Sequence, residues 1–196
     1  MVEINESQIH GTFFLDIQHG WPTGLLNTLN DACTDLVAAF NGTVPGWMHG
    51  LRVRVEPIQA LGLTSPGLIR FRTTGPSKWT VVHEFGHAWD FASGCTLSRE
   101  MQRRTHSFDL FAPLRMVFPD VPTFWYHVGS PPPPCGTDKN FTAMEDFAES
   151  VAAYVYPDRA KEKAMTRNYP YTKYQVNSFR QTARGLFIAE SMKQYM

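Results

Sequence analysis

The sequence predicts an α+β protein in which strands belong to the N-terminal half and helices dominate the C-terminal half. Two segments, 51–55 and 68–72, alternate apolar and arginine residues, which is typical of half-exposed strands. Downstream of residue 78, apolar residues recur mainly at helical spacing. Strands followed by helices favour the α+β class. We therefore expect one domain, with a small mixed sheet and helices in a lobe of about residues 1–94 and a mostly helical lobe of about residues 95–196.

The N-terminal lobe is expected to begin with a buried strand, because residues 11–17 read Gly-Thr-Phe-Phe-Leu-Asp-Ile. A helix follows over residues 22–40, where apolar side chains stand at helical spacing and proline suits the start. The two alternating strands come next, with arginines on their outward face: Arg52, Arg54, Arg70 and Arg72. Ser77 is then placed to cap a helix of about residues 78–92, which stops near Ser93-Gly94.

The C-terminal lobe is expected to open with a segment, residues 98–117, that is helical in part and interrupted by Pro113. Residues 119–140 are rich in proline, including the run Pro131–Pro134, and should form a loop of polyproline character. Three further helices are expected, over residues 143–156, 158–166 and 176–195.

The charge and composition of the chain exclude several classes of partner. Its 196 residues carry 18 Lys+Arg against 18 Asp+Glu, and only 18% are charged. Nucleic-acid binding needs a clustered positive excess, so no nucleic-acid partner is expected. No uninterrupted apolar run of about 18 residues is present, so no membrane partner is expected either. The low charge and the 13% of aromatic residues together indicate binding of something apolar or extended. The partner we expect is a peptide or protein substrate, and we expect the protein to be a monomer.

Residues 81–90, Val-Val-His-Glu-Phe-Gly-His-Ala-Trp-Asp, carry the candidate catalytic site. His83 and His87 are four residues apart, so on a helix they share one face and can hold one metal ion. Glu84 projects beside them, where its carboxylate can reach a metal-bound water. This is the arrangement that zinc-dependent hydrolysis needs. With 7 His in 196 residues, His-Glu-x-x-His arises by chance only roughly 0.01 times in such a chain.

A catalytic zinc ion needs a third protein ligand and an open fourth position. Metzincins take that ligand from the sixth residue after the second histidine, which here is Ser93, so this class is excluded. Glu145 and Glu149 are four residues apart and face the same way on the helix expected over residues 143–156. In the gluzincin arrangement the first acid binds zinc and the second orients a ligand histidine, which assigns these two roles to them. Asp146 is the rival ligand, although it points about 100° away from Glu145.

The segment His83-Glu84-Phe85-Gly86-His87, followed by Glu145-Asp146-Phe147-Ala148-Glu149, resembles the catalytic domain of the anthrax lethal factor-like metallopeptidases. That group includes the Pro-Pro endopeptidases, and its pattern is His-Glu-x-Gly-His and then Glu-x-Phe-Ala-Glu on a later helix. The resemblance implies a zincin-like metallopeptidase fold of gluzincin type. It also implies one Zn²⁺ held by His83, His87 and Glu145, with Glu84 as the general base. The insertion between the two motifs is longer than is usual in the group.

The same group stabilises the oxyanion with a tyrosine shortly before the third ligand, and residues 138–144 contain none. Tyr126, from the inserted loop, is the first candidate for this role. Other candidates are His127, Tyr169, Tyr171 and Tyr174. Asp90 follows His87 by three residues and can orient a ligand imidazole or bind an arginine of the C-terminal lobe, with an ordinary exposed acid as the alternative.

The three cysteines and the N-terminus bear on the compartment. Cys33 falls on the apolar face of its helix and is expected to be a buried free thiol. Cys95 and Cys135 flank the insertion, and a disulfide between them would pin both ligand helices if the protein is exported. Residues 1–6 are neither a signal nor a transit peptide, which leaves a cytosolic protein or one whose leader is not in this sequence. A secreted, extracellular location is the expectation.

Together these features predict a zinc-dependent metalloendopeptidase. Glu84 would activate a zinc-bound water for attack on a peptide carbonyl and pass the proton to the leaving amine. The substrate would lie extended along an edge strand. Two alternatives stay open: an amidase or deamidase acting on an amide outside the peptide chain, and a metal-binding module without catalysis.

Overall fold

The structure is a computed structural model that describes residues 4–109, 112–118, 125–126, 142–166 and 179–195. They form a mixed α+β protein, as the sequence predicts. The chain divides into two compact units, which we call unit 1 (Met1–Gly94 and Ser191–Met196) and unit 2 (Cys95–Glu190). Among the described helices, none combines the length and the apolarity needed to cross a membrane.

The described part of unit 1 contains a mixed sheet with the strand order β1-β2-β4-β3. Its strands are β1 (Asp16–Ile17), β2 (Arg52–Glu56), β3 (Gly62–Ser65) and β4 (Leu68–Arg72). β1, β2 and β4 are parallel, and β3 runs antiparallel to β4 at the edge of the sheet. One face buries Val53, Ile69 and Phe71, while the alternate positions of β2 and β4 carry the four arginines on the other face, as predicted.

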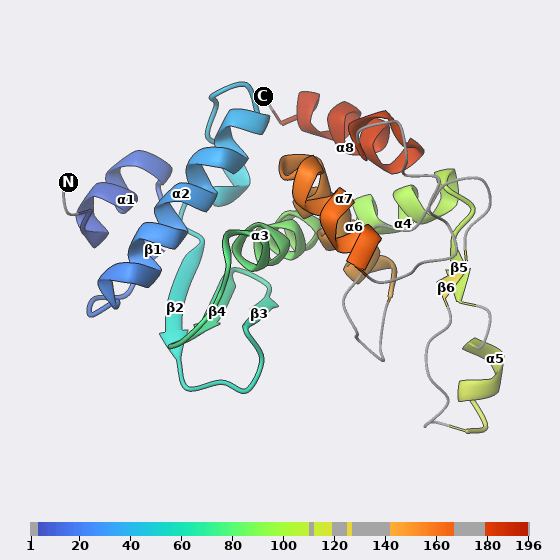
Figure 1. The fold of residues 1–196 in the computed structure, drawn as a ribbon, viewed down its shortest axis with the longest axis horizontal. Coiled ribbons are helices and arrows are strands. Elements are labelled where there is room, and N and C mark those ends of the chain that lie inside the picture. Colours follow the sequence, from blue (N-terminus) through green and yellow to red (C-terminus); the bar gives the residue numbers. More distant parts are fainter. Residues whose placement is uncertain (1–3, 110–111, 119–124, 127–141, 167–178, 196) are drawn as a thin grey trace. The chain divides into compact units, whose positions relative to one another are not determined.

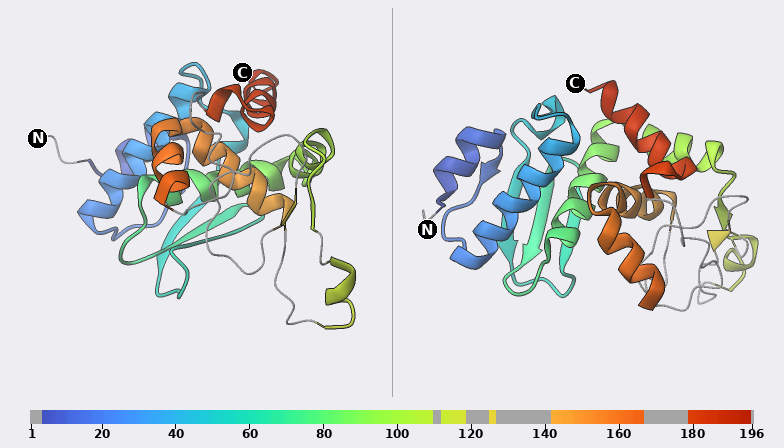
Figure 2. Two further views of the ribbon diagram at one scale, coloured as in Figure 1. Left: turned by 45° about the vertical axis from the view of Figure 1, so that its right-hand side comes forward. Right: turned by 45° about the horizontal axis from the view of Figure 1, so that its top comes forward.

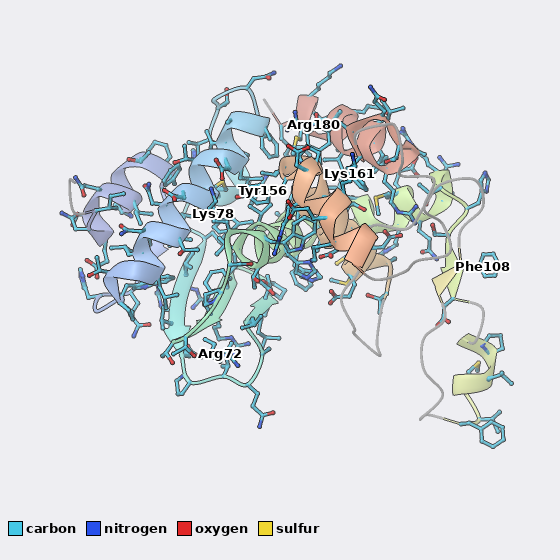
Figure 3. All side chains as sticks on the ribbon, in the orientation of Figure 1. Arg72, Lys78, Phe108, Tyr156, Lys161 and Arg180 are labelled. Atoms are coloured by element: carbon cyan, nitrogen blue, oxygen red, sulfur yellow. The ribbon has the colours of Figure 1, made fainter. Side chains whose placement is uncertain are left out.

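The helices of unit 1 are α1 (Glu6–Phe13), α2 (Thr23–Ala39) and α3 (Lys78–Ala92), with a short 3₁₀ turn, η1, over Gly46–Met48. α3 packs against β3, β4 and α2, and Figures 1 and 2 show it running beside these strands. Lys78, labelled in Figure 3, donates from Nζ to Asp35 Oδ2 of α2 at 2.7 Å. Val82, Phe85 and Trp89 are all buried, so they fix the inner face of α3.

The predicted boundaries of α3 are confirmed. Ser77 Oγ accepts the Thr80 N–H at 3.2 Å and caps the helix. At the other end, Ser93 is the C-cap and Gly94 adopts a φ of +70°, a left-handed conformation that favours glycine.

The prediction of a buried strand over residues 11–17 is wrong. α1 extends to Phe13, and only Asp16–Ile17 pair as a strand. A capping box fixes the start of α1, because Asn5 Oδ1 accepts the Gln8 N–H at 3.0 Å while Gln8 Oε1 accepts the Asn5 N–H at 2.9 Å. Phe14, with a φ of 58°, ends the helix in the left-handed region, and the strand begins two residues later.

The edge strand β3 is an element that the sequence does not predict. Its residues, Gly-Leu-Thr-Ser, are short and have little apolar character. They form a strand because β4 offers an edge, on which Gly62 pairs with Phe71 and Thr64 with Ile69. This strand proves central to the site described below.

The described residues of unit 2 lie mostly in helices, as predicted. Its elements are α4 (Thr96–Arg104), β5 (Phe108–Asp109), α5 (Ala112–Arg115), β6 (Trp125–Tyr126), α6 (Ala143–Val155), α7 (Pro157–Thr166) and η3 (Phe179–Gln181). The last helix, α8 (Ala183–Lys193), begins in unit 2 and ends in unit 1. α6 packs against α4 and α7. Thr142 Oγ1 accepts the Glu145 N–H at 3.4 Å and so caps α6.

Two of the predicted elements in unit 2 need correction. The segment 98–117 also contains β5, which pairs antiparallel with β6 through Phe108 and Tyr126. The predicted last helix over residues 176–195 is broken, because η3 is followed by Thr182, whose hydroxyl donates to Phe179 O at 2.7 Å and accepts the Gly185 N–H at 3.1 Å, starting α8 afresh. Of the predicted proline-rich loop, residues 119–124 and 127–140 lie outside the described residues.

Candidate metal centre

The two histidines of the motif lie one turn apart on α3 and present their Nε2 atoms to each other. These atoms are 3.2 Å apart, and the two rings are nearly perpendicular, at 84°. A tetrahedral zinc ion with Zn–N bonds of about 2.0–2.1 Å holds its nitrogen ligands about 3.3 Å apart. His87 is buried and His83 half-buried. The pair is therefore already spaced to chelate one metal ion.

Glu84 projects from the same turn of α3 and is only 6% exposed. Its Oε2 accepts a hydrogen bond from Thr64 Oγ1 of β3 at 2.6 Å, and the same hydroxyl lies 3.2 Å from the Glu84 main-chain oxygen. Gly62, two residues earlier on β3, lies against this carboxylate. Sequence reasoning missed both β3 residues, because nothing in the segment 62–65 marks it as a neighbour of α3.

Glu145 and Glu149 share one side of α6, as their spacing predicts. Glu145 is half-buried in the first turn of the helix. Glu149 is buried one turn later, where its Oε1 accepts a hydrogen bond from Lys163 Nζ of α7 at 3.2 Å. The role assigned to Glu149, which is to orient a ligand histidine, stays a prediction.

His83 and His87 belong to unit 1 and Glu145 to unit 2, and each of the three offers one atom that can bind a metal ion. Two imidazoles and one carboxylate are a donor set known for catalytic zinc, with a fourth position left for water or substrate. Other first-row transition metals also accept these ligands. The three residues thus stay the predicted ligand set, and their chemistry alone does not select the metal.

The acid next to Glu145 is engaged elsewhere, which removes the rival ligand. Asp146 is fully buried and forms a bidentate pair with Arg184, with Nε–Oδ1 and Nη2–Oδ2 distances of 2.8 and 2.7 Å. Both carboxylate oxygens already accept from a guanidinium, so Asp146 is a structural acid of unit 2.

Asp90 is fully buried, so the alternative of an exposed acid is wrong. Ser93 Oγ donates a hydrogen bond to the main-chain oxygen of Asp90 at 2.7 Å and lies 3.5 Å from Asp90 Oδ1. Its predicted function in orienting a ligand imidazole or binding an arginine stays a prediction.

The remaining candidates fall mostly outside the described part of the chain. Tyr126 lies on β6 opposite Phe108, and its role at the oxyanion stays a prediction. His127, Tyr169, Tyr171, Tyr174 and Cys135 lie outside the described residues.

The described cysteines are both free thiols. Cys33 is buried, as predicted, and its burial raises the pKa of the thiol. Cys95 is also a free thiol, and Cys135, with which a bridge is predicted, lies outside the described residues.

Comparisons of this chain with protein-family models, with curated proteins and with solved structures find no match.

Proposed function

We propose that this chain is a zinc-dependent metalloendopeptidase of gluzincin type with a zincin-like fold. One observation carries the proposal: α3 presents two imidazole Nε2 atoms 3.2 Å apart, and a buried carboxylate from the same helical turn is fixed beside them. Two imidazoles that approach this closely, with a carboxylate on the same helical turn, form the set of groups that metal-assisted hydrolysis requires.

His83, His87 and Glu145 would hold the zinc ion. Bound there, zinc supplies Lewis acidity and lowers the pKa of water. The Glu84 carboxylate accepts a proton from the attacking water and returns it to the amine that leaves when the peptide bond breaks. Glu149 and Asp90 would keep the imidazoles oriented.

An extended peptide substrate is the partner that suits this geometry. β3 is an edge strand of the sheet and lies next to α3, so a peptide that passes Glu84 can add to the sheet along this strand. A monomeric, extracellular enzyme is part of the same proposal.

The test is a comparison of Glu84→Gln with the wild-type protein on a peptide library, with and without a chelator. Glutamine keeps the shape of the side chain but cannot accept the proton, so cleavage should fall by about 10²- to 10⁴-fold. The zinc content, measured by atomic emission, should stay at the wild-type level. Glu162→Gln, at an exposed position on α7, is the matched control and should cleave normally.

Three outcomes would count against the peptidase. Cleavage that continues in the presence of the chelator would show that the reaction does not need a metal ion. Unchanged activity of Glu84→Gln would leave a metal-binding module without catalysis. Protein substrates that are altered without a break in the chain, as shown by mass spectrometry, would indicate an amidase or deamidase.

A further inference from the structure

Glu84 receives its hydrogen bond from a neighbouring strand and not from its own helix. Thr64 Oγ1 donates to Oε2 at 2.6 Å, and both residues belong to unit 1. A buried carboxylate is costly unless polar groups satisfy it, so this hydroxyl has a large effect on where the carboxylate rests. No hydrogen bond to Glu84 Oε1 is present among the described residues, which leaves that oxygen for a proton.

Gly62 provides the space into which the carboxylate fits. A Cβ atom at this position would lie 2.5 Å from Glu84 Cγ, 2.6 Å from Oε1 and 2.7 Å from Cδ. These distances are far below van der Waals contact, so any side chain would push the carboxylate away. The glycine is needed here for the close approach of strand and side chain.

Gly62 and Thr64 are two residues apart on a strand and therefore face the same side of the sheet. Gly62 leaves the space that the Glu84 carboxylate occupies, and Thr64 donates a hydrogen bond to that carboxylate. Together they select a single position for the Glu84 side chain. The donor is an uncharged hydroxyl, which fixes the position of the Glu84 carboxylate through one short hydrogen bond.

We propose that Thr64 and Gly62 are positioning residues that hold the Glu84 carboxylate for proton transfer. This inference rests on the proposed function of Glu84 as the general base. It gives two residues of the edge strand β3 a part in catalysis, although neither would bind the metal ion.

The main experiment compares Thr64→Val, which removes only the hydroxyl, with Thr64→Ser, which restores it. We expect kcat of Thr64→Val to fall by about 10- to 100-fold with KM within about twofold, because a misplaced general base slows proton transfer without weakening substrate binding. Thr64→Ser should recover to within about threefold of wild type. Gly62→Ala should lower kcat at least as much as Thr64→Val.

The control is Thr34→Val on α2, which removes an exposed threonine hydroxyl that bonds the Asn30 main-chain oxygen at 2.9 Å. Its kcat should equal that of wild type. Zinc content and thermal unfolding of all variants show whether the metal site and the fold persist. Crystal structures of Thr64→Val and Thr64→Ser provide a readout apart from activity, with the Glu84 carboxylate displaced in the first and retained in the second.

The inference is overturned if Thr64→Val keeps the wild-type kcat, or if Thr64→Ser is as slow as Thr64→Val. If the wild-type protein cleaves no peptide, the proposed function fails, and the crystal structures then decide the positioning by themselves. An unmoved Glu84 carboxylate in Thr64→Val would overturn it in that case.

Discussion

Cys33 lies in a part of unit 1 that water does not reach. The residue is 0% exposed on α2, and its burial raises the pKa of the thiol because the thiolate would lose its hydration. Only the thiolate reacts rapidly with disulfide reagents. The thiol should therefore be inert in the native protein, even at alkaline pH.

The measurement uses a Cys95→Ser, Cys135→Ser variant, in which Cys33 is the remaining cysteine. We expect no reaction with Ellman's reagent in the native state and one thiol after unfolding. The unfolded thiol ionises near its usual pKa of about 8.5 while the folded thiol keeps its proton, so the free energy of unfolding should decrease as pH rises above that value. Rapid labelling of the native variant would show that this interior opens.

How well single residues can be predicted depends on how local their contacts are. His83, Glu84 and His87 follow from spacing on one helix, which geometry fixes without knowledge of the fold. Thr64 is separated from Glu84 by 20 residues, and a threonine in a short polar segment carries no sign of that contact. Asp146 is the rival ligand in the sequence, and its pairing with Arg184, 38 residues away, has no local signal either.

At the scale of elements, the stability of α3 depends on the cap at its first turn. Ser77 Oγ accepts the Thr80 N–H at 3.2 Å and also lies 3.1 Å from Thr80 Oγ1. Ser77→Ala should lower the free energy of unfolding by about 1 kcal/mol, because a helical N–H loses its acceptor. Urea unfolding of the purified protein measures this change.

The control for the cap is Ser7→Ala, at an exposed position within α1. It should change the free energy of unfolding by less than about 0.5 kcal/mol. Equal effects of the two substitutions would contradict a specific capping role for Ser77.

Elements with their own start and stop signals were predictable, and elements that depend on a partner were not. The helices α3 and α6 carry caps and an apolar face in their own sequence, so their bounds were anticipated closely. β3 exists because β4 offers an edge, which is information that its four residues lack. The error over residues 11–17 has a local cause, since the capping box at Asn5 outweighs an apolar run that also suits a strand.

At the scale of the whole molecule, the chain has few charges, and the ion pair between Asp146 and Arg184 lies deep within unit 2. Asp146 of α6 and Arg184 of α8 are both fully buried. Arg184 Nη2 also donates to Ser107 Oγ at 2.8 Å, and Ser107 Oγ lies 2.7 Å from Thr105 Oγ1. This network joins α6, α8 and the segment after α4, so it ties together the mostly helical part of the protein around the helix that carries Glu145.

Arg184→Met should therefore destabilise the protein strongly, because it leaves the Asp146 carboxylate buried without its cation. The expected loss in free energy of unfolding is about 3–5 kcal/mol. Arg159→Met is the matched control, since Arg159 pairs with Glu162 at 2.7 Å on the exposed side of α7 and such a pair contributes about 0–1 kcal/mol.

The double variant Asp146→Leu, Arg184→Met removes both charges and should recover most of the loss in free energy of unfolding, because an apolar pair satisfies a buried site about as well as an ion pair. Denaturant unfolding of the three variants measures these changes in the free energy of unfolding. If Arg184→Met lowers that free energy no more than Arg159→Met does, the network does not hold the helices of unit 2 together.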